Sequence, residues 1–516
     1  MTIGSFLCID GYEIILLNQD SKFMSLAQTS SQPKQPLRAS HVSVLLLVFA
    51  GVWLWHLSSA SLTAPQDNLE QLLWTHSLQW GYYKHPPLPT WLLWPWLTLF
   101  GWHAWVSYLW GAFVSLLAFV LFWRLLADLR GRQYAFLALL AALCITYYNG
   151  RLYYYNHNTV LMLFVCLSAW ASWQAMQTQR RKWWVVLGLA LGAGALSKYQ
   201  IAISVLCVLV FFIQQGAWRI AAQRQGLVIA GAVSMLVFAP HAFWLQANEF
   251  APLAYARESS LGVSLSGGKR VIHSMRWLVD MLLNRALPAW LLLVIVASLA
   301  AKLGEEKAST ESESNKVKAR AFLLIWGAVP LLFIVFLGLV TGAELAPHWG
   351  TAFLLFAIPA AMELWPKLWP RAQIKYALAT FVMLQALLLL ASYLTSYKGP
   401  ANLRDKHWRS IDSARLASQI EPKAQEILGR PARVLIGSAN ISMAIAMQLP
   451  GKPLVLVDGR FDRSPWIPAD LVERCGAIEI IKGVPVNPPP EVQVFGKAYP
   501  GWGWKIVRPT RPDASC

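Results

Sequence analysis

The chain has 516 residues, of which 56% are hydrophobic and 27 are Trp, and its mean hydropathy is +0.43. An ordinary soluble domain is about 45–50% apolar, so this composition excludes a soluble globular protein and indicates a polytopic α-helical membrane protein. The formal charge of +18 does not indicate a nucleic-acid partner, because Lys and Arg occur in small clusters between apolar runs. In such places they orient a membrane protein and contact anionic lipid.

The first 40 residues are polar and precede the first apolar run, so we expect a cytoplasmic N-terminal segment over residues 1–40. This segment has no signal-peptide pattern with a small-residue cleavage site. Met24 lies shortly before the apolar run. Residues 1–23 can therefore be an upstream extension that the mature protein lacks.

Apolar runs close to the roughly 20 residues that cross a bilayer recur from His41 onward. They predict about eleven transmembrane helices within a membrane domain of residues 41–397. The expected spans are residues 41–60, 105–126, 133–149, 158–176, 183–197, 199–215, 226–245, 280–301, 321–341, 349–365 and 374–394. Residues 61–104 and 246–279 are the long outer loops. The second is rich in aromatic and basic residues and is expected to fold over a site at the membrane surface.

The distribution of charge orients these spans. If the N-terminus is cytoplasmic, most Lys and Arg between spans fall in cytoplasmic loops, as the positive-inside rule requires. The first outer loop and the C-terminal region then face outward, which for a bacterial inner membrane is the periplasm. Residues 303–320 have mixed charge and no apolar pattern, and they are predicted to be a flexible cytoplasmic linker.

The composition changes beyond residue 397. Residues 431–459 place two apolar β-like runs around a helical stretch, which predicts one β-α-β unit. We therefore expect a small α/β domain outside the membrane over residues 398–516. A nucleotide-binding role is not indicated, because the Gly-x-Gly-x-x-Gly pattern is missing.

The cysteines allow one disulfide without requiring it, and they do not indicate a zinc site. Cys144, Cys166 and Cys207 lie in predicted spans, where they are most simply small core residues. Cys475 and Cys516 are the pair that can form a disulfide in an oxidising compartment. No CxxC or HxxxH spacing indicates structural zinc.

Residues 67–88 hold the densest group of carboxylates, bases and aromatic residues in the chain. Asp67 and Glu70 are three residues apart, so on a helix both carboxylates lie on one face. Tyr83, Lys84 and His85 follow, directly before a Pro-Pro pair. This pattern predicts a short interfacial helix that ends in a rigid, aromatic and basic turn.

These residues resemble the first outer loop of the bacterial branch of the GT-C glycosyltransferases, the relatives of protein O-mannosyltransferases and of the lipid A aminoarabinose transferase. Further segments are similar to that branch and occur in the same order. They are Asn156-His157-Asn158-Thr159-Val160-Leu161, Leu196-Ser197-Lys198-Tyr199, Glu344-Leu345-Ala346-Pro347-His348-Trp349, Leu449-Pro450-Gly451 and Ser464-Pro465-Trp466. Each motif is weak alone, but their order is fairly specific.

The resemblance implies a GT-C fold and the inverting transfer of a hexose or pentose from a polyprenyl-phosphate carrier. The acceptor would be a hydroxyl of a lipid, glycan or protein on the outer face of the inner membrane. Asp67 matches the general base, a role that typically contributes ~10²–10⁴-fold in rate, and Glu70 accompanies it. Cations must meet the charge that develops on the leaving phosphate. The predicted donor-binding residues are Tyr83, Lys84, His85, Asn158, Lys198, Arg257, Glu344 and His348, with Arg270 as a further cation.

Three positions depart from the pattern of that branch. Asn68 stands where many relatives have a second acidic residue, and Asn158 stands where an Asp is frequent. A two-carboxylate metal site is therefore not supported, and no metal or other cofactor is predicted. His85 stands where the aminoarabinose transferases often have Lys, so either His85 or Lys84 contacts the phosphate. With its ordinary pKa of about 6.5, His85 would make donor binding depend on pH.

Each of these residues also has a purely structural interpretation. First-turn acids stabilise a helix N-terminus, basic residues anchor a membrane interface or extend to water, and Asn caps helices. Asp67 and Glu70 can be such first-turn acids. Lys84 and Lys198 can be such basic anchors, and Asn156 and Asn158 can be such caps. In the same way Glu344 can pair with His348, Arg257 can pair with Glu258 on the surface, and the Trp residues between 91 and 110 are expected to form an interfacial belt.

A secondary transporter or lipid flippase is the alternative function. Such proteins show broken spans at matching places in two halves, with ionisable residues near the middle of the membrane. Here the ionisable residues gather at the outer ends of the predicted spans, and no such halves are evident. The expected partners are a polyprenyl-phosphate-linked sugar, an acceptor and membrane lipid.

Overall fold

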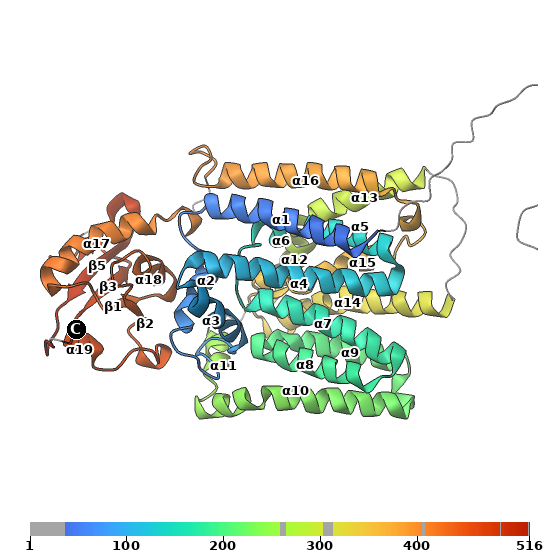
Figure 1. Ribbon diagram of the computed structural model, residues 1–516, viewed down its shortest axis with the longest axis horizontal. Coiled ribbons are helices and arrows are strands. Elements are labelled where there is room, and N and C mark those ends of the chain that lie inside the picture. The colour runs from blue at the N-terminus through green and yellow to red at the C-terminus, as the bar shows by residue number, and fades with distance from the viewer. Residues whose placement is uncertain (1–36, 259–264, 303–312, 405–407, 486, 514) are drawn as a thin grey trace, which may run out of the picture. The chain divides into compact units, whose positions relative to one another are not determined.

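A computed structural model describes residues 37–258, 265–302, 313–404, 408–485, 487–513 and 515–516. Helices form the first part of the described chain and a small sheet forms the last (Figure 1). The hypothesis that residues 1–23 are an upstream extension falls outside the described residues.

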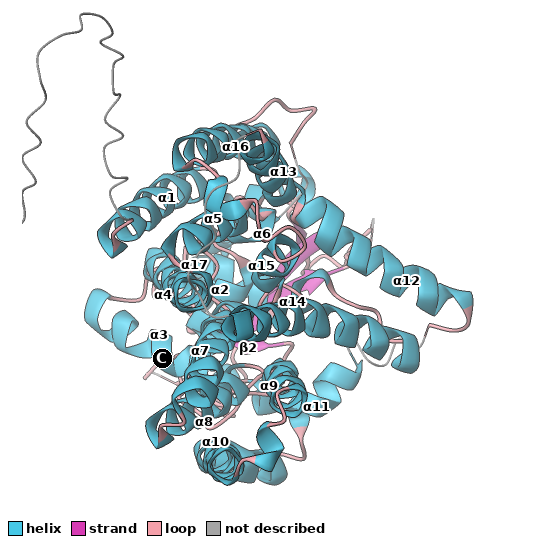
Figure 2. Cartoon of the chain, turned by 90° about the vertical axis from the view of Figure 1, so that its right-hand side faces the viewer, coloured by secondary structure: helices cyan, strands magenta, loops and turns pink. Residues whose placement is uncertain are grey.

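The helices follow one another along the chain. They are α1 (Ala39–Ser59), α2 (Gln66–Trp74), α3 (Leu88–Phe100), α4 (Ala104–Arg130), α5 (Arg132–Leu143), α6 (Thr146–Gly150), α7 (His157–Thr178), α8 (Arg181–Ser197), α9 (Ala202–Gln214), α10 (Ala221–Ala247), α11 (Ala251–Ala256), α12 (Gly268–Val279), α13 (Leu287–Ala301), α14 (Glu313–Thr341), α15 (Ala357–Met362) and α16 (Ile374–Thr395). Figure 2 shows α10 end-on, whereas α12 runs across the view.

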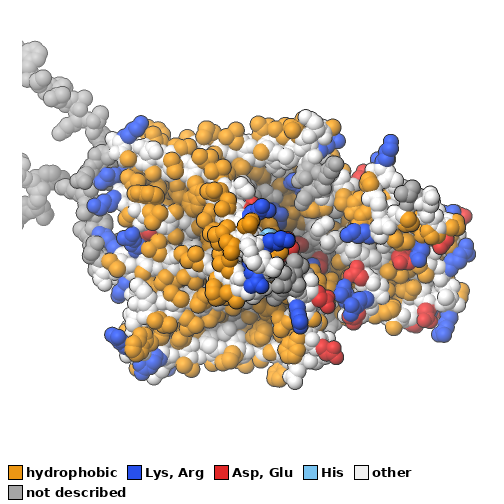
Figure 3. Space-filling model, turned by 180° about the vertical axis from the view of Figure 1, so that it is seen from behind, with side chains coloured by type: hydrophobic (Ala, Val, Ile, Leu, Met, Phe, Trp, Pro, Cys, Tyr) orange, Lys and Arg blue, Asp and Glu red, His pale blue; other side chains and the backbone are white. Residues whose placement is uncertain are grey.

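Within the described residues, six helices are long and apolar enough to cross a membrane: α1, α4, α7, α10, α14 and α16. A seventh is present if residues 268–285 and α13, which meet at 55°, are one broken span. Shorter apolar helices occupy residues 132–143 and 199–214. The chain is thus a multi-pass membrane protein, and Figure 3 shows the apolar side chains that cover its helical part.

The predicted span 349–365 is wrong as a single helix. The structure places 3-10 turns at Pro347–Trp349 and Leu354–Phe356 and then the short α15. Phe353, Leu354 and Phe356 are fully buried in the protein. The run is apolar because it belongs to the protein core, and hydropathy alone does not separate that case from lipid exposure.

The predicted linker 303–320 is partly helical, because α14 begins at Glu313. Residues 303–312 lie outside the described ranges. The predicted outer loop 246–279 also holds regular structure, since α11 and α12 form within it.

Helices α8 and α10 approach each other closely at two glycines of α8. A Cβ on Gly188 of α8 would lie 2.6 Å from the carbonyl oxygen of Ala230 on α10, and a Cβ on Gly192 would lie 2.7 Å from Val237. Small residues permit such close contact between helices in a membrane, where packing drives association. This contact holds α8 in place, and α8 ends beside Lys198.

The C-terminal part is a five-stranded sheet in the order β2-β1-β3-β5-β4. Its strands are β1 (Val434–Gly437), β2 (Leu454–Val457), β3 (Ala477–Lys482), β4 (Gln493–Val494) and β5 (Trp502–Val507). The predicted β-α-β unit is present. Strands β1 and β2 pair in parallel, and α18 (Ala439–Ala446) connects them in the chain. Buried residues of α17 (Ser413–Leu428) and α18 join one apolar core, and α19 (Leu471–Cys475) joins a second core.

The sheet domain and α2 share a hydrophobic core. Leu69, Leu72 and Leu73 of α2 belong to the same buried cluster as Met443 and Ile445 of α18. Figure 1 shows α18 beside α2. The C-terminal domain therefore packs directly on the helix that carries Asp67 and Glu70.

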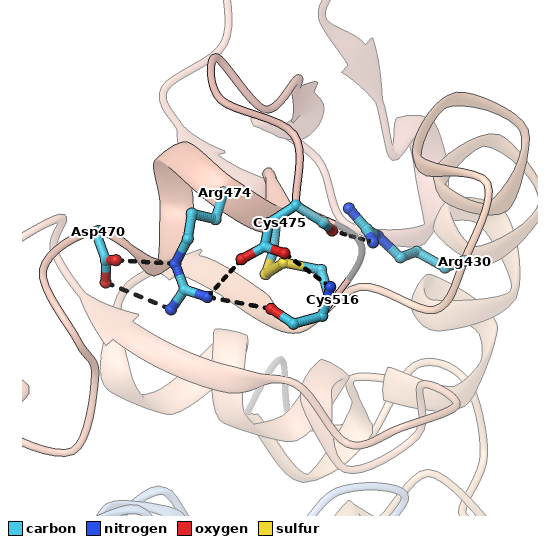
Figure 4. Close-up of a disulfide and its surroundings, with 7 residues drawn as sticks. Arg430, Asp470, Arg474, Cys475 and Cys516 are labelled. Atoms are coloured by element: carbon cyan, nitrogen blue, oxygen red, sulfur yellow. Dashed lines mark hydrogen bonds and ion pairs between the residues drawn. A yellow bond between two sulfur atoms is a disulfide. The ribbon is translucent and has the colours of Figure 1, made fainter.

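The sequence left a disulfide between Cys475 and Cys516 open, and the structure has it. Cys475 and Cys516 are bonded, with Cα atoms 5.5 Å apart. Arg474 ties the same region together, because it forms ion pairs with Asp470 at 2.8 Å and with Asp513 at 3.2 Å (Figure 4).

Candidate functional site

The helix α2 has two faces with different contacts. Its leucines pack against α18, while Asp67 and Glu70 reach a cavity of 540 Å³. The sequence-predicted residues that line this cavity are Asp67, Glu70, Lys84, His85, Asn158, Lys198 and His348. Residues from four separate parts of the sequence therefore meet at one place.

Glu70 is neutralised by Lys84. The Lys84 ammonium donates to both carboxylate oxygens of Glu70, at 3.0 and 3.1 Å. Burial raises the pKa of Glu70, although the charge of Lys84 opposes this effect. Burial also lowers the pKa of Lys84, but Glu70, Tyr255, Tyr83 and Asp67 together outweigh this effect, so the net shift is upward and Lys84 stays charged.

Asp67 has a neutral partner instead. The side-chain amide of Asn156 donates to Asp67 Oδ2 at 2.7 Å. The carbonyl oxygen of the same side chain accepts from the backbone N–H of Thr159 at 2.9 Å and so caps α7. The helix cap thus orients the amide, and the amide fixes the carboxylate without neutralising it.

Lys198 lies between α8 and the following 3-10 turn. Its ammonium donates to Asn158 Oδ1 at 2.7 Å, which is a neutral partner. Burial lowers the pKa of Lys198 to about 8, although the charge of Asp67 opposes the shift. Lys198 is therefore mostly charged at neutral pH and carries a charge that no carboxylate among the described residues compensates by contact.

The expectation that His85 titrates near pH 6.5 is wrong. The His85 ring lies 4.0 Å from the ring of His157, centre to centre. Burial lowers the pKa of His85 well below its ordinary value, and the neighbouring His157 and Lys84 lower it further. A positive charge on His85 would lie in a poorly solvated place beside a cation, so His85 is neutral at pH 6–7.

Part of the cavity lining is apolar. Ala202 and Ile203 of α9, Leu253 of α11, and Phe333 and Leu337 of α14 supply it. The charged lining residues are two carboxylates, Asp67 and Glu70, and three cations, Lys84, Arg151 and Lys198. The cavity thus offers charged and apolar surface in one space.

Tyr83 supports the cavity rather than lining it. Its ring meets the Tyr255 ring edge-on at 5.8 Å, and the guanidinium of Arg463 lies 5.0 Å from the ring centre. Arg463 belongs to the C-terminal domain and pairs with Asp458 at 2.9 Å. Tyr83 therefore joins the turn that carries Lys84 to both α11 and the C-terminal domain.

Besides Tyr83, two predicted donor-binding residues are not part of the cavity lining. Arg257 and Glu344 are both exposed. Among the described residues, no ion pair joins Glu344 to His348 or Arg257 to Glu258. Arg270 is also elsewhere, since its guanidinium donates to the backbone carbonyl of Val340 at 3.2 Å. Sequence order placed these residues in outer loops, but it did not specify which way their side chains point.

Asn68 has a structural role that explains its departure from the family pattern. It is fully buried, donates to Ser107 Oγ and to the carbonyl of Tyr153, and accepts from the backbone N–H of Tyr155, all at 2.9 Å. A carboxylate at this position would lose both donated bonds. Within the described residues, no three His, Cys, Asp or Glu side chains are arranged to hold a metal ion.

The sequence analysis missed Arg151 and its aromatic neighbours. Arg151 lines the cavity together with Tyr147, Tyr199 and Tyr255. Arg151 belongs to none of the motifs that carry the family resemblance. An arginine in a Tyr-rich turn directly before the Asn156 motif was the signal that could have identified it.

Comparisons with known proteins agree with this architecture. Residues 84–244 match the family model described as dolichyl-phosphate-mannose-protein mannosyltransferase. The lipopolysaccharide core galacturonosyltransferase RgtA of Rhizobium johnstonii is 26% identical over 209 residues, which are 39% of this chain and 39% of that protein. The lipid A galacturonosyltransferase RgtD of the same organism is 23% identical over 338 residues, 63% of this chain and 66% of that protein.

Among solved structures, ArnT from Cupriavidus metallidurans bound to undecaprenyl phosphate is similar, with a TM-score of 0.59 and 16% identity. That match covers 86% of this chain and 94% of ArnT. The apo form of ArnT gives a TM-score of 0.52 at 15% identity, over 91% of this chain and 97% of that one. The alignments span less than two thirds of either curated relative. The chain has the GT-C fold, and its sequence is similar to those of bacterial GT-C glycosyltransferases.

Proposed function

We propose that the chain transfers a hexose or pentose, with inversion, from a polyprenyl-phosphate carrier to an acceptor hydroxyl at the periplasmic face of the inner membrane. The combination of charged and apolar surface in one cavity is the observation that carries this proposal. A polyprenyl phosphate sugar has a charged head and an apolar tail, which match the charged and apolar surface of the cavity. The ArnT structure that is similar to this chain is bound to such a lipid phosphate.

The contacts of the two carboxylates favour Asp67 as the general base. Both oxygens of Glu70 accept from Lys84, whereas Asp67 accepts from the neutral Asn156. Asp67 takes the proton of the acceptor hydroxyl, whose oxygen attacks the anomeric carbon from the side opposite the phosphate. The bond from that carbon to the phosphate oxygen breaks, and its electron pair stays on the phosphate. Displacement from the opposite side inverts the configuration.

Lys198 and Lys84 are the cations proposed to meet the leaving phosphate. A fixed positive charge is most effective where negative charge develops in a poorly solvated site. Lys198 fits this task because its side-chain contact is the neutral Asn158. With side-chain cations in this role, we expect chelation by EDTA to leave the transfer rate unchanged.

The proposed orientation is supported by two independent features. Lys and Arg gather at the end of the helical part away from the C-terminal domain (Figure 3), as cytoplasmic loops require. The Cys475–Cys516 disulfide lies in the domain at the other end. We therefore place the N-terminal segment in the cytoplasm and the C-terminal domain in the periplasm.

The substitution Asp67→Asn tests the function. We expect transfer to fall by ~10²–10⁴-fold, because the base is lost, while binding of undecaprenyl phosphate persists. Asp128→Asn is the matched control, since Asp128 accepts from Trp170 and Gln174 outside the cavity. Normal transfer by Asp67→Asn would remove Asp67 from the mechanism. Lipid uptake or efflux without a glycosylated product would instead support a flippase or transporter.

A further inference from the structure

His241 is a fully buried histidine that the proposed reaction leaves without a task. It lies near the C-terminal end of α10, the helix that packs on α8 (Figure 2). Its ring uses both nitrogens. Nδ1 lies 2.6 Å from the carbonyl oxygen of Trp80, and Nε2 lies 2.8 Å from the hydroxyl oxygen of Tyr199. One imidazole thus joins α10 to two segments that are far apart in the sequence.

The partners of His241 fix the place of its proton. A backbone carbonyl can only accept, so Nδ1 donates to Trp80. On a neutral imidazole Nε2 is then an acceptor, and the hydroxyl of Tyr199 donates to it. Among the described residues no carboxylate contacts this ring. A neutral imidazole therefore satisfies both bonds without leaving a buried charge unpaired.

Close packing holds the ring of His241 in this orientation. The ring of Trp244 lies nearly parallel to it, at 12° and 5.7 Å, and the ring of Phe238 meets it edge-on at 5.3 Å. A Cβ on Gly81 would lie only 2.8 Å from Cε1 of His241, so the backbone next to Trp80 lies directly against the ring. These contacts leave the imidazole little room to turn away from its two partners.

The two segments that His241 joins each carry a cation of the proposed reaction. Lys84 lies four residues after Trp80, and Lys198 directly precedes Tyr199. Both lysines line the same cavity, where two positive charges repel each other. A neutral link between their segments opposes this repulsion without adding a further charge.

We infer that His241 is a positioning residue, which sets the spacing of Lys84 and Lys198, the two cations proposed to meet the leaving phosphate. This inference rests on the proposed function, because it concerns the phosphate end of the same reaction. Fixed charges are most effective when they need not move as negative charge develops. His241 does not line the cavity itself, so it acts through the two lysines.

The two hydrogen bonds act in series, because breaking either one separates the segment of Lys84 from that of Lys198. Two substitutions break one bond each. In His241→Asn the amide nitrogen takes the place of Nδ1 and still donates to Trp80, but the Tyr199 hydroxyl loses its acceptor. In His241→Gln the amide oxygen takes the place of Nε2 and still accepts from Tyr199, but the Trp80 carbonyl loses its donor.

Binding of undecaprenyl phosphate to the full-length protein in nanodiscs measures the effect of these substitutions. We expect His241→Asn and His241→Gln each to weaken binding by roughly 5–10-fold, as partial loss of a charge-assisted contact gives. His241→Phe breaks both bonds and should weaken binding by the same factor, because the link is already broken by the loss of one. If its loss equals the product of the other two losses, the bonds act independently and the inference is wrong.

A double-variant cycle tests whether the effect passes through Lys198. Lys198→Gln removes one of the two cations, so their spacing no longer matters. Adding His241→Asn to Lys198→Gln should therefore change the affinity by less than about 2-fold. A histidine that only supports the fold would weaken binding by the same factor in both backgrounds, and that result overturns the inference.

His56→Phe is the matched control. His56 is also a buried histidine of a transmembrane helix, and its Nε2 lies 3.0 Å from Ser392 Oγ, between α1 and α16 and outside the cavity lining. This substitution should leave the affinity for undecaprenyl phosphate unchanged. Unfolding temperatures above the temperature of the binding experiment establish that every variant is folded.

The remaining outcomes separate this inference from the proposed function. Wild-type affinity in all three His241 variants overturns the inference alone. Failure of the wild-type protein to bind undecaprenyl phosphate overturns the proposed function and, with it, the inference.

Discussion

Asn156 couples the start of α7 to the carboxylate of Asp67. Its amide nitrogen donates to Asp67 at 2.7 Å, and its carbonyl oxygen caps the helix through Thr159 at 2.9 Å. Because the cap fixes which side of the amide faces the cavity, Asp67 always meets a donor there. The proposed base is thus oriented by a residue some ninety positions later in the chain.

Asn156→Ser separates the two tasks of this side chain. Serine is also a good helix cap, but it is too short to replace the amide at Asp67. We expect kcat to fall by roughly 10-fold, the value of a hydrogen bond to a charged group, with little change in donor affinity or unfolding temperature. A variant that loses donor affinity but keeps kcat would show that Asn156 acts on binding instead.

The Glu70–Lys84 pair should behave as one unit. Removing Lys84 by Lys84→Met leaves a buried carboxylate without its partner, at a cost of about 3–5 kcal/mol in the free energy of unfolding. The double variant Glu70→Gln/Lys84→Met should be more stable than Lys84→Met alone. Thermal or denaturant unfolding measures this, with Arg460→Met as control because the Arg460–Asp462 pair is exposed. Additive effects of the two substitutions would contradict the coupling.

Donor binding should weaken as the pH rises through about 8. Burial lowers the pKa of Lys198 to about 8, so its positive charge is present below this pH and is lost above it. Titration of the binding of a polyprenyl phosphate sugar, a phosphodiester that keeps one negative charge from pH 5 to 10, should show one decline near pH 8. Burial lowers the pKa of His85 well below its ordinary value, so we expect no separate step near 6.5. In Lys198→Arg the affinity should persist to higher pH. An unchanged decline in that variant would exclude Lys198 as its origin.

The contact between Arg463 and Tyr83 should couple the C-terminal domain to donor binding. A cation–π contact is worth about 0.5–1 kcal/mol at exposed sites, so Arg463→Ala should weaken donor binding by roughly 2–5-fold. Arg460→Ala removes a neighbouring Arg, which pairs with Asp462 in the same loop, and should have no effect. Equal affinities of both variants and the wild-type protein would limit Arg463 to a role within its own domain.

The disulfide reports the side of the membrane on which its domain lies. Cys475→Ser removes a disulfide between residues with a sequence separation of 41, and such a loss typically costs about 2–5 kcal/mol in the free energy of unfolding.

In intact cells, a thiol reagent should label Cys475 and Cys516 only after reduction. Free thiols at both positions before reduction would contradict a periplasmic domain.

The sequence predicted the elements whose signal is local. The spacing of Asp67 and Glu70 placed both on one face of a helix, and the apolar runs around residues 439–446 predicted the β-α-β unit. The contacts of Arg151 and of Tyr83 with Arg463 were not predictable, because they depend on which distant segments meet. The segment around Phe353 was misread because burial in protein and burial in lipid select the same side chains.

The core that α2 shares with α18 also sets an order of assembly. During synthesis α2 emerges near the beginning of the chain, but α18, which covers its leucines, is made only after α16. Until then Asp67 and Glu70 stand on a helix without its support. A chain that ends before α18 therefore lacks part of the core that supports the helix carrying both carboxylates.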